Sequence, residues 1–183
     1  HVTAATGVDA LSHAIEAYVA KGATPMTQAL AYRAISLIGG ALPMVVGNGA
    51  DVAAREAMAL ASYMAGIAFS NAGLGLCHAM SHQIGATYNI AHGVANAIML
   101  PYIIDFNRRA STKYAMVEKL LGQTGVRAFV LGHDQQPRRI LVDAVDDAGP
   151  LDSADAGQAA AAMVEQGVDQ GAVEIAGGRM NDQ

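Results

Sequence analysis

Three of the chain's six histidines lie within residues 73–93, the stretch GLGLCHAMSHQIGATYNIAHG. His78, His82 and His92 stand there among Ala, Met, Ile and Leu, and no charged residue occurs in the stretch. Imidazole rings surrounded by apolar sequence need a polar partner, and neutral imidazole is the commonest metal ligand near neutral pH. The chain must therefore adopt a fold that packs histidines between apolar elements, with a metal ion as one candidate partner.

The spacing of these histidines sharpens the prediction. His78 and His82 are four residues apart, so on a helix both side chains lie on one face. His92 follows a segment expected to interrupt that helix, and a second helix can return it to the same point. Upstream, Asp9 and His13 show the same spacing in TGVDALSHAIEAY. One carboxylate and three imidazoles make a donor set suited to a single iron or zinc ion.

Composition and periodicity predict an all-α helical bundle. The chain is rich in Ala and Gly and has no Trp, which suits closely packed helices better than a β-sandwich. No run of useful length alternates between apolar and polar residues, so no strand is expected. The expected helices cover residues 6–22, 24–43, 51–73, 74–89, 93–101 and 112–122, with weak helices at 138–147 and 153–166.

Charge divides the chain into two parts. Residues 1–133 hold eight Lys/Arg and six Asp/Glu, whereas residues 134–183 hold three and ten. We therefore predict a helical metal-binding domain at residues 1–124 and a divergent, weakly helical acidic tail at residues 125–183. Neither part has the clustered basic face that nucleic-acid binding requires.

The remaining features bear on location in the cell. Cys77 is the single cysteine, so an internal disulfide is excluded and a reducing, cytoplasmic compartment is expected. We expect Cys77 to be a small buried side chain, with a thiolate ligand as the alternative.

Residues 57–81 carry no charge and are long enough to span a bilayer, but their glycines favour a buried helix pair. Because the sequence begins with His1, we expect a piece of a longer polypeptide, and it shows no secretory signal.

Several stretches together resemble the C-terminal, metal-binding half of the iron-containing (group III) alcohol dehydrogenases. The matching residues are TGVDALSHAIEAY, ATPMTQALAYRAI and REAMALASYMAGIAFSNAGLGLCHAMSHQIGATYNIAHGVANAIMLPYIIDFN, together with the helix that follows, and they cover residues 1 to about 121. The resemblance implies the helical domain of a two-domain fold, of the dehydroquinate-synthase-like kind. In that fold a separate N-terminal α/β domain binds most of the NAD or NADP, and its glycine-rich phosphate loop does not occur in this sequence.

The resemblance also implies roles for particular residues. Asp9, His13, His78 and His92 match the family's metal ligands for Fe²⁺, or alternatively Zn²⁺. His82 matches a histidine near substrate and nicotinamide, for which proton relay or substrate contact is expected. Phe69 falls where the family places an aromatic ring beside the nicotinamide, although a role in the core is equally compatible with the sequence.

Three functions stay open. The first is the catalytic domain of an NAD(P)-dependent alcohol dehydrogenase or aldehyde reductase, in which a metal-bound alkoxide passes a hydride to nicotinamide and the protein forms a homodimer. The second is a truncated, non-catalytic helical fragment that binds metal or dimerises. The third is a related activity on glycerol, diols, lactaldehyde or maleylacetate. Zinc-protease chemistry is disfavoured, because HAMSH has Met80 and Ser81 between its histidines and lacks the Glu of H-E-x-x-H.

Overall fold

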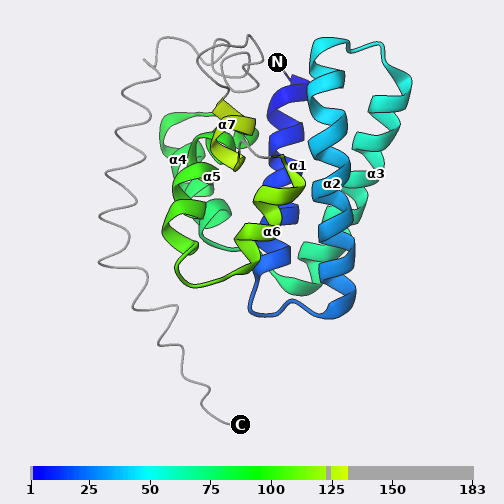
Figure 1. Ribbon diagram of the computed structural model, residues 1–183. Helices are drawn as coiled ribbons and strands as arrows, with labels where there is room; N and C mark the ends of the chain where they lie inside the picture. Colours follow the sequence, from blue (N-terminus) through cyan, green and yellow to red (C-terminus); the bar gives the residue numbers. More distant parts are fainter. Residues whose placement is uncertain (1, 123–124, 132–183) are drawn as a thin grey trace. The chain divides into compact units, whose positions relative to one another are not determined.

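Seven α-helices account for the regular structure of residues 2–122 and 125–131, the part of the chain that the computed structural model describes. This part contains no strand, so the all-α prediction is confirmed. The three longest helices come first (Figure 1). The helices are α1 Val2–Val19, α2 Pro25–Gly47, α3 Val52–Ala72, α4 Leu76–Tyr88, α5 His92–Asn107, α6 Lys113–Leu120 and α7 Gly125–Leu131.

Helix α1 is the element that the other helices share. It packs against α2 and α3 on one side and against α5 and α4 on another, and in Figure 1 it lies between the α2–α3 pair and the green α4–α5 pair. Its apolar residues recur at the helical period, so they form a stripe toward α2 and α3. Large side chains that are almost completely buried fill this core, among them Leu11, Ile15, Ile35, Ile38 and Leu42.

Local sequence signals explain where the long helices begin. Thr24 forms a capping box with Thr27 at the start of α2, and Pro25 follows in the first turn, where its missing N–H costs nothing. The Asp51 carboxylate accepts the Ala54 N–H at 3.0 Å and starts α3. The helix starts expected at residues 24 and 51 are therefore confirmed to within one residue.

Other boundaries differ from the prediction. Helix α1 begins at Val2 rather than near residue 6, and α2 continues past Pro43 to Gly47. Helix α5 runs through Pro101 without a break. In both proline-containing helices, buried neighbours such as Leu42 and Leu100 hold the chain in the core, and tertiary packing outweighs the lost backbone hydrogen bond.

The predicted tail is described only at its start. Helix α7, Gly125–Leu131, is an element that the sequence did not predict. The weak helices expected at 138–147 and 153–166 lie outside the described residues. All described residues belong to one compact unit, His1–Gly149.

Two apolar regions in the described part of the chain are long enough and apolar enough to cross a membrane, judged by length and composition alone. One is α2, and the other would be α3 joined to α4, which are bent by 104° at the break between them. That break confirms a pair of helices over residues 57–81, but the prediction that the pair is buried was wrong for α3, in which only four alanines are buried. In the bundle, α2 turns the side that carries Ile35, Ile38 and Leu42 into the core, as the core helix of a globular protein does.

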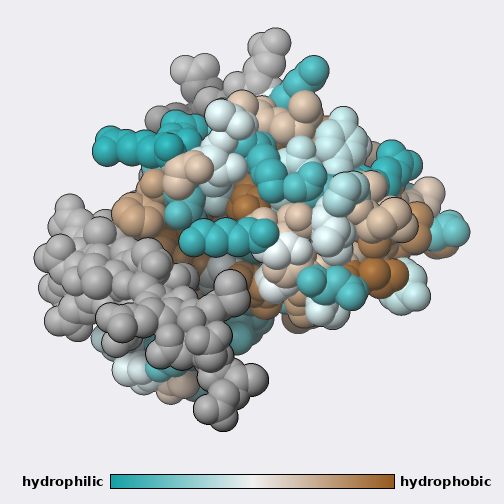
Figure 2. Space-filling model, turned by 90° about the horizontal axis from the view of Figure 1, so that it is seen from below, coloured by the Kyte–Doolittle hydropathy of each residue, from teal (hydrophilic) through white to brown (hydrophobic). Residues whose placement is uncertain are grey.

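The surface mixes polar and apolar side chains. Leu60, Tyr63 and Ile67 of α3 are exposed at helical spacing. The face drawn in Figure 2 interleaves teal and brown areas over the described residues. The three α3 side chains share one face of that helix, and exposed apolar side chains are usual on a folded domain.

Candidate metal centre

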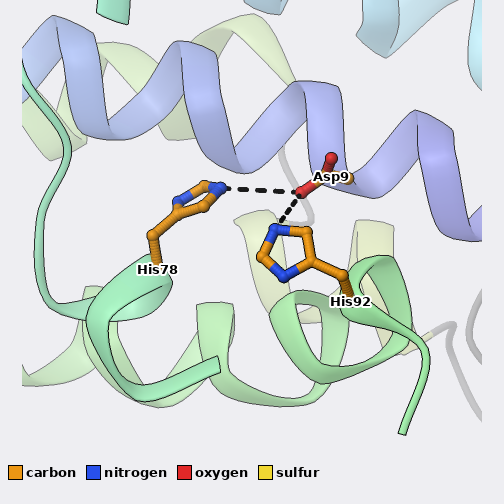
Figure 3. Close-up of side chains that lie close together, drawn as sticks. All are labelled: Asp9, His78 and His92. Carbon is orange, nitrogen blue, oxygen red and sulfur yellow. Dashed lines mark ion pairs between the residues drawn. The ribbon is translucent and has the colours of Figure 1, made fainter. Parts of the chain in front are cut away.

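Three helices bring the predicted ligand residues together. Asp9 projects from α1, His78 from α4 and His92 from the first turn of α5, and their side chains point toward one another (Figure 3). Close packing of α5 on α1 makes this possible, because a Cβ added to Gly93 would lie 2.4 Å from the carbonyl oxygen of Ala5. The His-Gly pair at the start of α5 thus lets His92 approach α1.

The donor atoms lie within reach of one ion. One ligand atom from each of Asp9, His78 and His92 can be chosen so that all three lie within 4.8 Å of one another. Asp9 Oδ1 is 3.5 Å from His78 Nε2 and 3.3 Å from His92 Nε2. His78 is buried and the other two are half-buried. The cluster therefore has an enclosed side and an accessible side.

His13 lies beside this group of three without belonging to it. Its ring centroid is 4.1 Å from that of His78, and its Nδ1 is 3.6 Å from Asp9 Oδ2. The Nδ1–H donates to the backbone carbonyl of Asp9 at 2.9 Å, the tautomer that leaves Nε2 with a lone pair. His13 is thus positioned as a neighbouring donor.

The two further predicted residues flank the cluster. His82 is exposed, and its ring stacks on His92 with centroids 5.0 Å apart. Phe69 of α3 stacks on His13 with centroids 4.5 Å apart, and it also packs against a small core of Ala17, Ala31 and Ala68. Phe69 therefore contacts both the candidate centre and the hydrophobic core.

Two residues of the centre were missed by the sequence interpretation. Glu16 of α1 accepts the Nδ1–H of His78 at 2.7 Å, and Asn96 of α5 donates to Asp9 Oδ1 at 2.6 Å. The helical spacing that identified the histidines also applies to these two residues. Glu16 continues the helical stripe of Asp9 and His13, and Asn96 follows His92 by four residues.

Electrostatics favour a positive charge within the centre. Burial opposes the charge of Asp9, but the hydrogen bond to His78 and the nearby imidazoles outweigh it and lower the pKa of the carboxyl. Burial lowers the pKa of His13 and His92 below the ordinary histidine value, so both rings are neutral at pH 7. Burial acts the same way on His78, yet its hydrogen bonds to Asp9 and Glu16 outweigh it and raise the pKa to about 9. The two carboxylates thus stabilise a cation between them.

Cys77 is completely buried, as the sequence predicted. Its Sγ lies 3.5 Å from Asn96 Oδ1 and takes no part in the group of three donors. Burial raises the pKa of this thiol well above its ordinary value, so the thiolate form that a metal would need is disfavoured.

Comparison with known proteins decides the family. The profile described as "Fe-containing alcohol dehydrogenase family, C-terminal" matches residues 3–147, most of the chain. The chain belongs to the iron-containing alcohol dehydrogenase family. The match extends beyond residue 121, where the stretches that carry the resemblance end.

Individual relatives agree with this membership. The chain is 65% identical over 108 residues to the probable alcohol dehydrogenase EutG of Escherichia coli, covering 59% of this chain and 27% of that protein. It is 56% identical over 123 residues to the NAD-dependent methanol dehydrogenase of Bacillus methanolicus, covering 67% and 32%. An iron-containing alcohol dehydrogenase structure from Thermococcus thioreducens superposes with a TM-score of 0.66 at 33% identity, covering 92% and 43%. The chain therefore spans about a third of the length of the curated relatives that it matches.

Proposed function

We propose that this chain is the metal-binding catalytic domain of an NAD(P)-dependent alcohol dehydrogenase or aldehyde reductase. The observation that carries the proposal is the convergence of donor atoms from Asp9, His78 and His92 within 4.8 Å. His13, adjacent to Asp9 and His78, is the proposed fourth ligand. We assign Fe²⁺ to the centre, with Zn²⁺ as the alternative, because imidazole and carboxylate donors suit both ions.

The donor set fits such an ion in protonation as well as in position. A ligand must present a lone pair, so Asp9 has to be ionised and the rings of His13 and His92 neutral. The pKa directions of these three groups favour those forms. His78 differs, because its pKa of about 9 means that both ring nitrogens carry a proton at pH 7. An ion must displace the proton on Nε2, while Glu16 accepts the proton that stays on Nδ1. The carboxylates of Asp9 and Glu16 also offset the two positive charges of the ion.

The chain's own residues would position the reactants. An ion held by these residues would supply Lewis-acid chemistry to the oxygen of an alcohol or aldehyde, and the nicotinamide would supply the redox chemistry. Asp9 and the buried His78 fix the enclosed side of the centre. The exposed His82, stacked on His92, is placed for substrate contact or for moving a proton to solvent. Phe69, stacked on His13, is placed to contact the nicotinamide.

The whole protein's substrate and assembly are part of the proposal. One relative is named for methanol and NAD, which supports a small alcohol or aldehyde as substrate and a nicotinamide cofactor. We assign most contacts with the dinucleotide to a separate domain, since this chain spans about a third of its relatives. A cytoplasmic homodimer is proposed with it, without a nucleic-acid or membrane partner. Glycerol, diols, lactaldehyde and maleylacetate stay alternative substrates.

Metal binding by the 183-residue chain tests the centre. We expect about one iron or zinc ion per chain after anaerobic purification in its presence, measured by elemental analysis. His78→Ala should lose most of this metal, whereas Glu56→Gln, an exposed carboxylate on α3, should retain it. Equal metal content in both variants would refute the proposed centre.

A non-catalytic fragment is the second candidate, and it is favoured by the share of the relatives that the chain spans. The two candidates make different predictions for nicotinamide. Calorimetric titration of NAD into the zinc-loaded chain can separate them. Binding in the micromolar range would argue against a non-catalytic fragment, whereas undetectable binding is compatible with both candidates, because most contacts with the dinucleotide are assigned to a separate domain.

A further inference from the structure

Glu16 of α1 is a buried carboxylate with both oxygens engaged. The residue is 5% exposed. Its Oε1 accepts the backbone N–H of Cys77 at 2.7 Å, and its Oε2 accepts the Nδ1–H of His78, also at 2.7 Å. Because an ionised carboxyl group buried without partners is strongly unfavourable, these two hydrogen bonds keep Glu16 inside the bundle.

The contact with Cys77 gives α4 the cap that its own sequence lacks. The residue before α4 is Gly75, which offers no side-chain hydrogen bond. The first N–H groups of a helix have no partner within the helix, and negative charge is stabilising there. Glu16 supplies both the acceptor and the charge from another helix. A Cβ on residue 75 would lie 2.9 Å from Glu16 Oε1, so the glycine leaves space for this contact.

The contact with His78 determines which ring nitrogen faces the candidate centre. A carboxylate can only accept hydrogen bonds, so His78 Nδ1 must carry a proton. The other nitrogen, Nε2, then points toward Asp9 Oδ1 at 3.5 Å and Asn96 Nδ2 at 3.4 Å. Only Nε2 is left to offer a lone pair to an ion, and Glu16 prevents the ring from turning over.

We propose that Glu16 is a positioning residue for the metal centre. It holds His78 with Nε2 toward the ion and attaches the start of α4 to α1 through the same carboxylate, so metal affinity depends on a residue that does not touch the metal. The proposal rests on the proposed function, because it requires that the centre binds an ion. Partners of this kind typically change metal affinity by about 10- to 100-fold.

The chemistry of the carboxylate makes Glu16→Gln the informative variant. Glutamine has nearly the same size but only one acceptor oxygen, while Cys77 and His78 both present N–H donors. If its oxygen stays with Cys77, its amide group donates to His78 Nδ1 and the ring proton moves to Nε2, the atom needed by the ion. The variant thus preserves packing and changes the preferred tautomer.

Zinc binding by the 183-residue chain provides the test. We expect Glu16→Gln to weaken Zn²⁺ affinity by about 10- to 100-fold in competition with a chromophoric chelator. The control, Glu56→Gln on α3, should bind Zn²⁺ as the wild type does. In the zinc-loaded wild type, ring ¹⁵N shifts should show His78 protonated at Nδ1 and coordinated through Nε2.

The outcomes separate this proposal from the one on which it rests. Absence of zinc binding by the wild type would refute the metal centre and this inference with it. Wild-type binding together with unchanged affinity in Glu16→Gln would refute the role of Glu16 alone. If Glu16→Gln fails to fold, the ¹⁵N shifts of the wild type still decide, since coordination through Nδ1 would overturn the proposal.

Discussion

The α1–α2–α3 bundle and the α4–α5 pair are held in place by different interactions. Helices α2 and α3 begin with caps from their own preceding residues, Thr24 and Asp51. Helices α4 and α5 follow Gly75 and Ala91, and neither has a side-chain cap of its own. The start of α4 instead depends on Glu16 of α1. The first region is therefore specified locally, whereas the second depends on contacts between helices.

The buried side chains differ in the same way. The residues that α2 and α3 bury are apolar, apart from Thr27. The α4–α5 pair buries His78, Ser81 and Asn96 together with Cys77. Polar groups in a core cost free energy unless they find partners, and here the partners include Asp9 and Glu16. We conclude that apolar burial in the α1–α2–α3 bundle provides most of the folding free energy. This free energy offsets the cost of burying the polar centre in the α4–α5 pair.

The largest expected effect is a loss of stability in the apolar bundle. Leu42 of α2 is completely buried and packs against Gly7 of α1. Leu42→Ala should lower the free energy of unfolding by about 2–5 kcal/mol through lost contacts and a cavity. Urea unfolding followed by circular dichroism measures this loss. The Zn²⁺ affinity of the remaining folded protein should be unchanged, and a parallel loss of affinity would show that the two regions are not separable.

The second expected effect is stabilisation by metal. A ligand that binds only the folded state at about 100 times its dissociation constant raises the free energy of unfolding by about 2.7 kcal/mol. We expect the added hydrogen-exchange protection to be largest for amides of α4 and α5, because His78 and His92 lie there. His78→Ala should abolish the stabilisation. Uniform protection across all the helices would argue against a pair that depends on its polar centre.

The third effect is steric and tests the contact between the two regions. Gly93→Ala would place a Cβ 2.4 Å from the backbone oxygen of Ala5, so α5 must shift away from α1 and His92 away from Asp9. We expect a loss of about 1–3 kcal/mol in unfolding free energy and weaker Zn²⁺ binding. Denaturation and zinc titration measure the two changes.

A matched control for that variant lies in α2. A Cβ added to Gly40 meets nothing within 4 Å, so Gly40→Ala should raise the unfolding free energy by about 0.5–1 kcal/mol through helix propensity. Zinc affinity should not change. Destabilisation by both alanines would mean that helix packing on α1 is not the reason for the effect at Gly93.

The sequence predicted the local features of this molecule well. Apolar periodicity predicted most of the helices and the starts near residues 24 and 51, because helical periodicity and the caps at Thr24 and Asp51 depend on residues close in the chain. The spacing of Asp9 with His13 and the block around His78 and His92 identified side chains that the structure brings together.

Features that depend on contacts distant in the chain were not predicted. Glu16 continues the helical stripe of Asp9 and His13, but its partner Cys77 is 61 residues away in the sequence, so their contact becomes visible only once α4 is packed on α1. The continuation of α2 past Pro43 likewise follows from burial of its neighbours and contradicts local preference. Propensity describes one helix at a time, whereas these features arise from packing between helices.

The smallest expected effect concerns Asp51, which caps α3 from the preceding residue. It is compared with the effect at Glu16, which caps α4 from another helix. Asp51→Ala removes the 3.0 Å hydrogen bond to the Ala54 N–H and should lower the free energy of unfolding by about 1 kcal/mol. Zinc affinity should be unaffected, because Asp51 caps α3 and has no contact with the histidines. Glu16→Gln keeps one oxygen for the Cys77 N–H at the start of α4 and loses the oxygen that accepts the Nδ1–H of His78. Zinc affinity should therefore fall in Glu16→Gln and stay unchanged in Asp51→Ala. An equal response in the two variants would show that general destabilisation, rather than orientation of His78, controls metal binding.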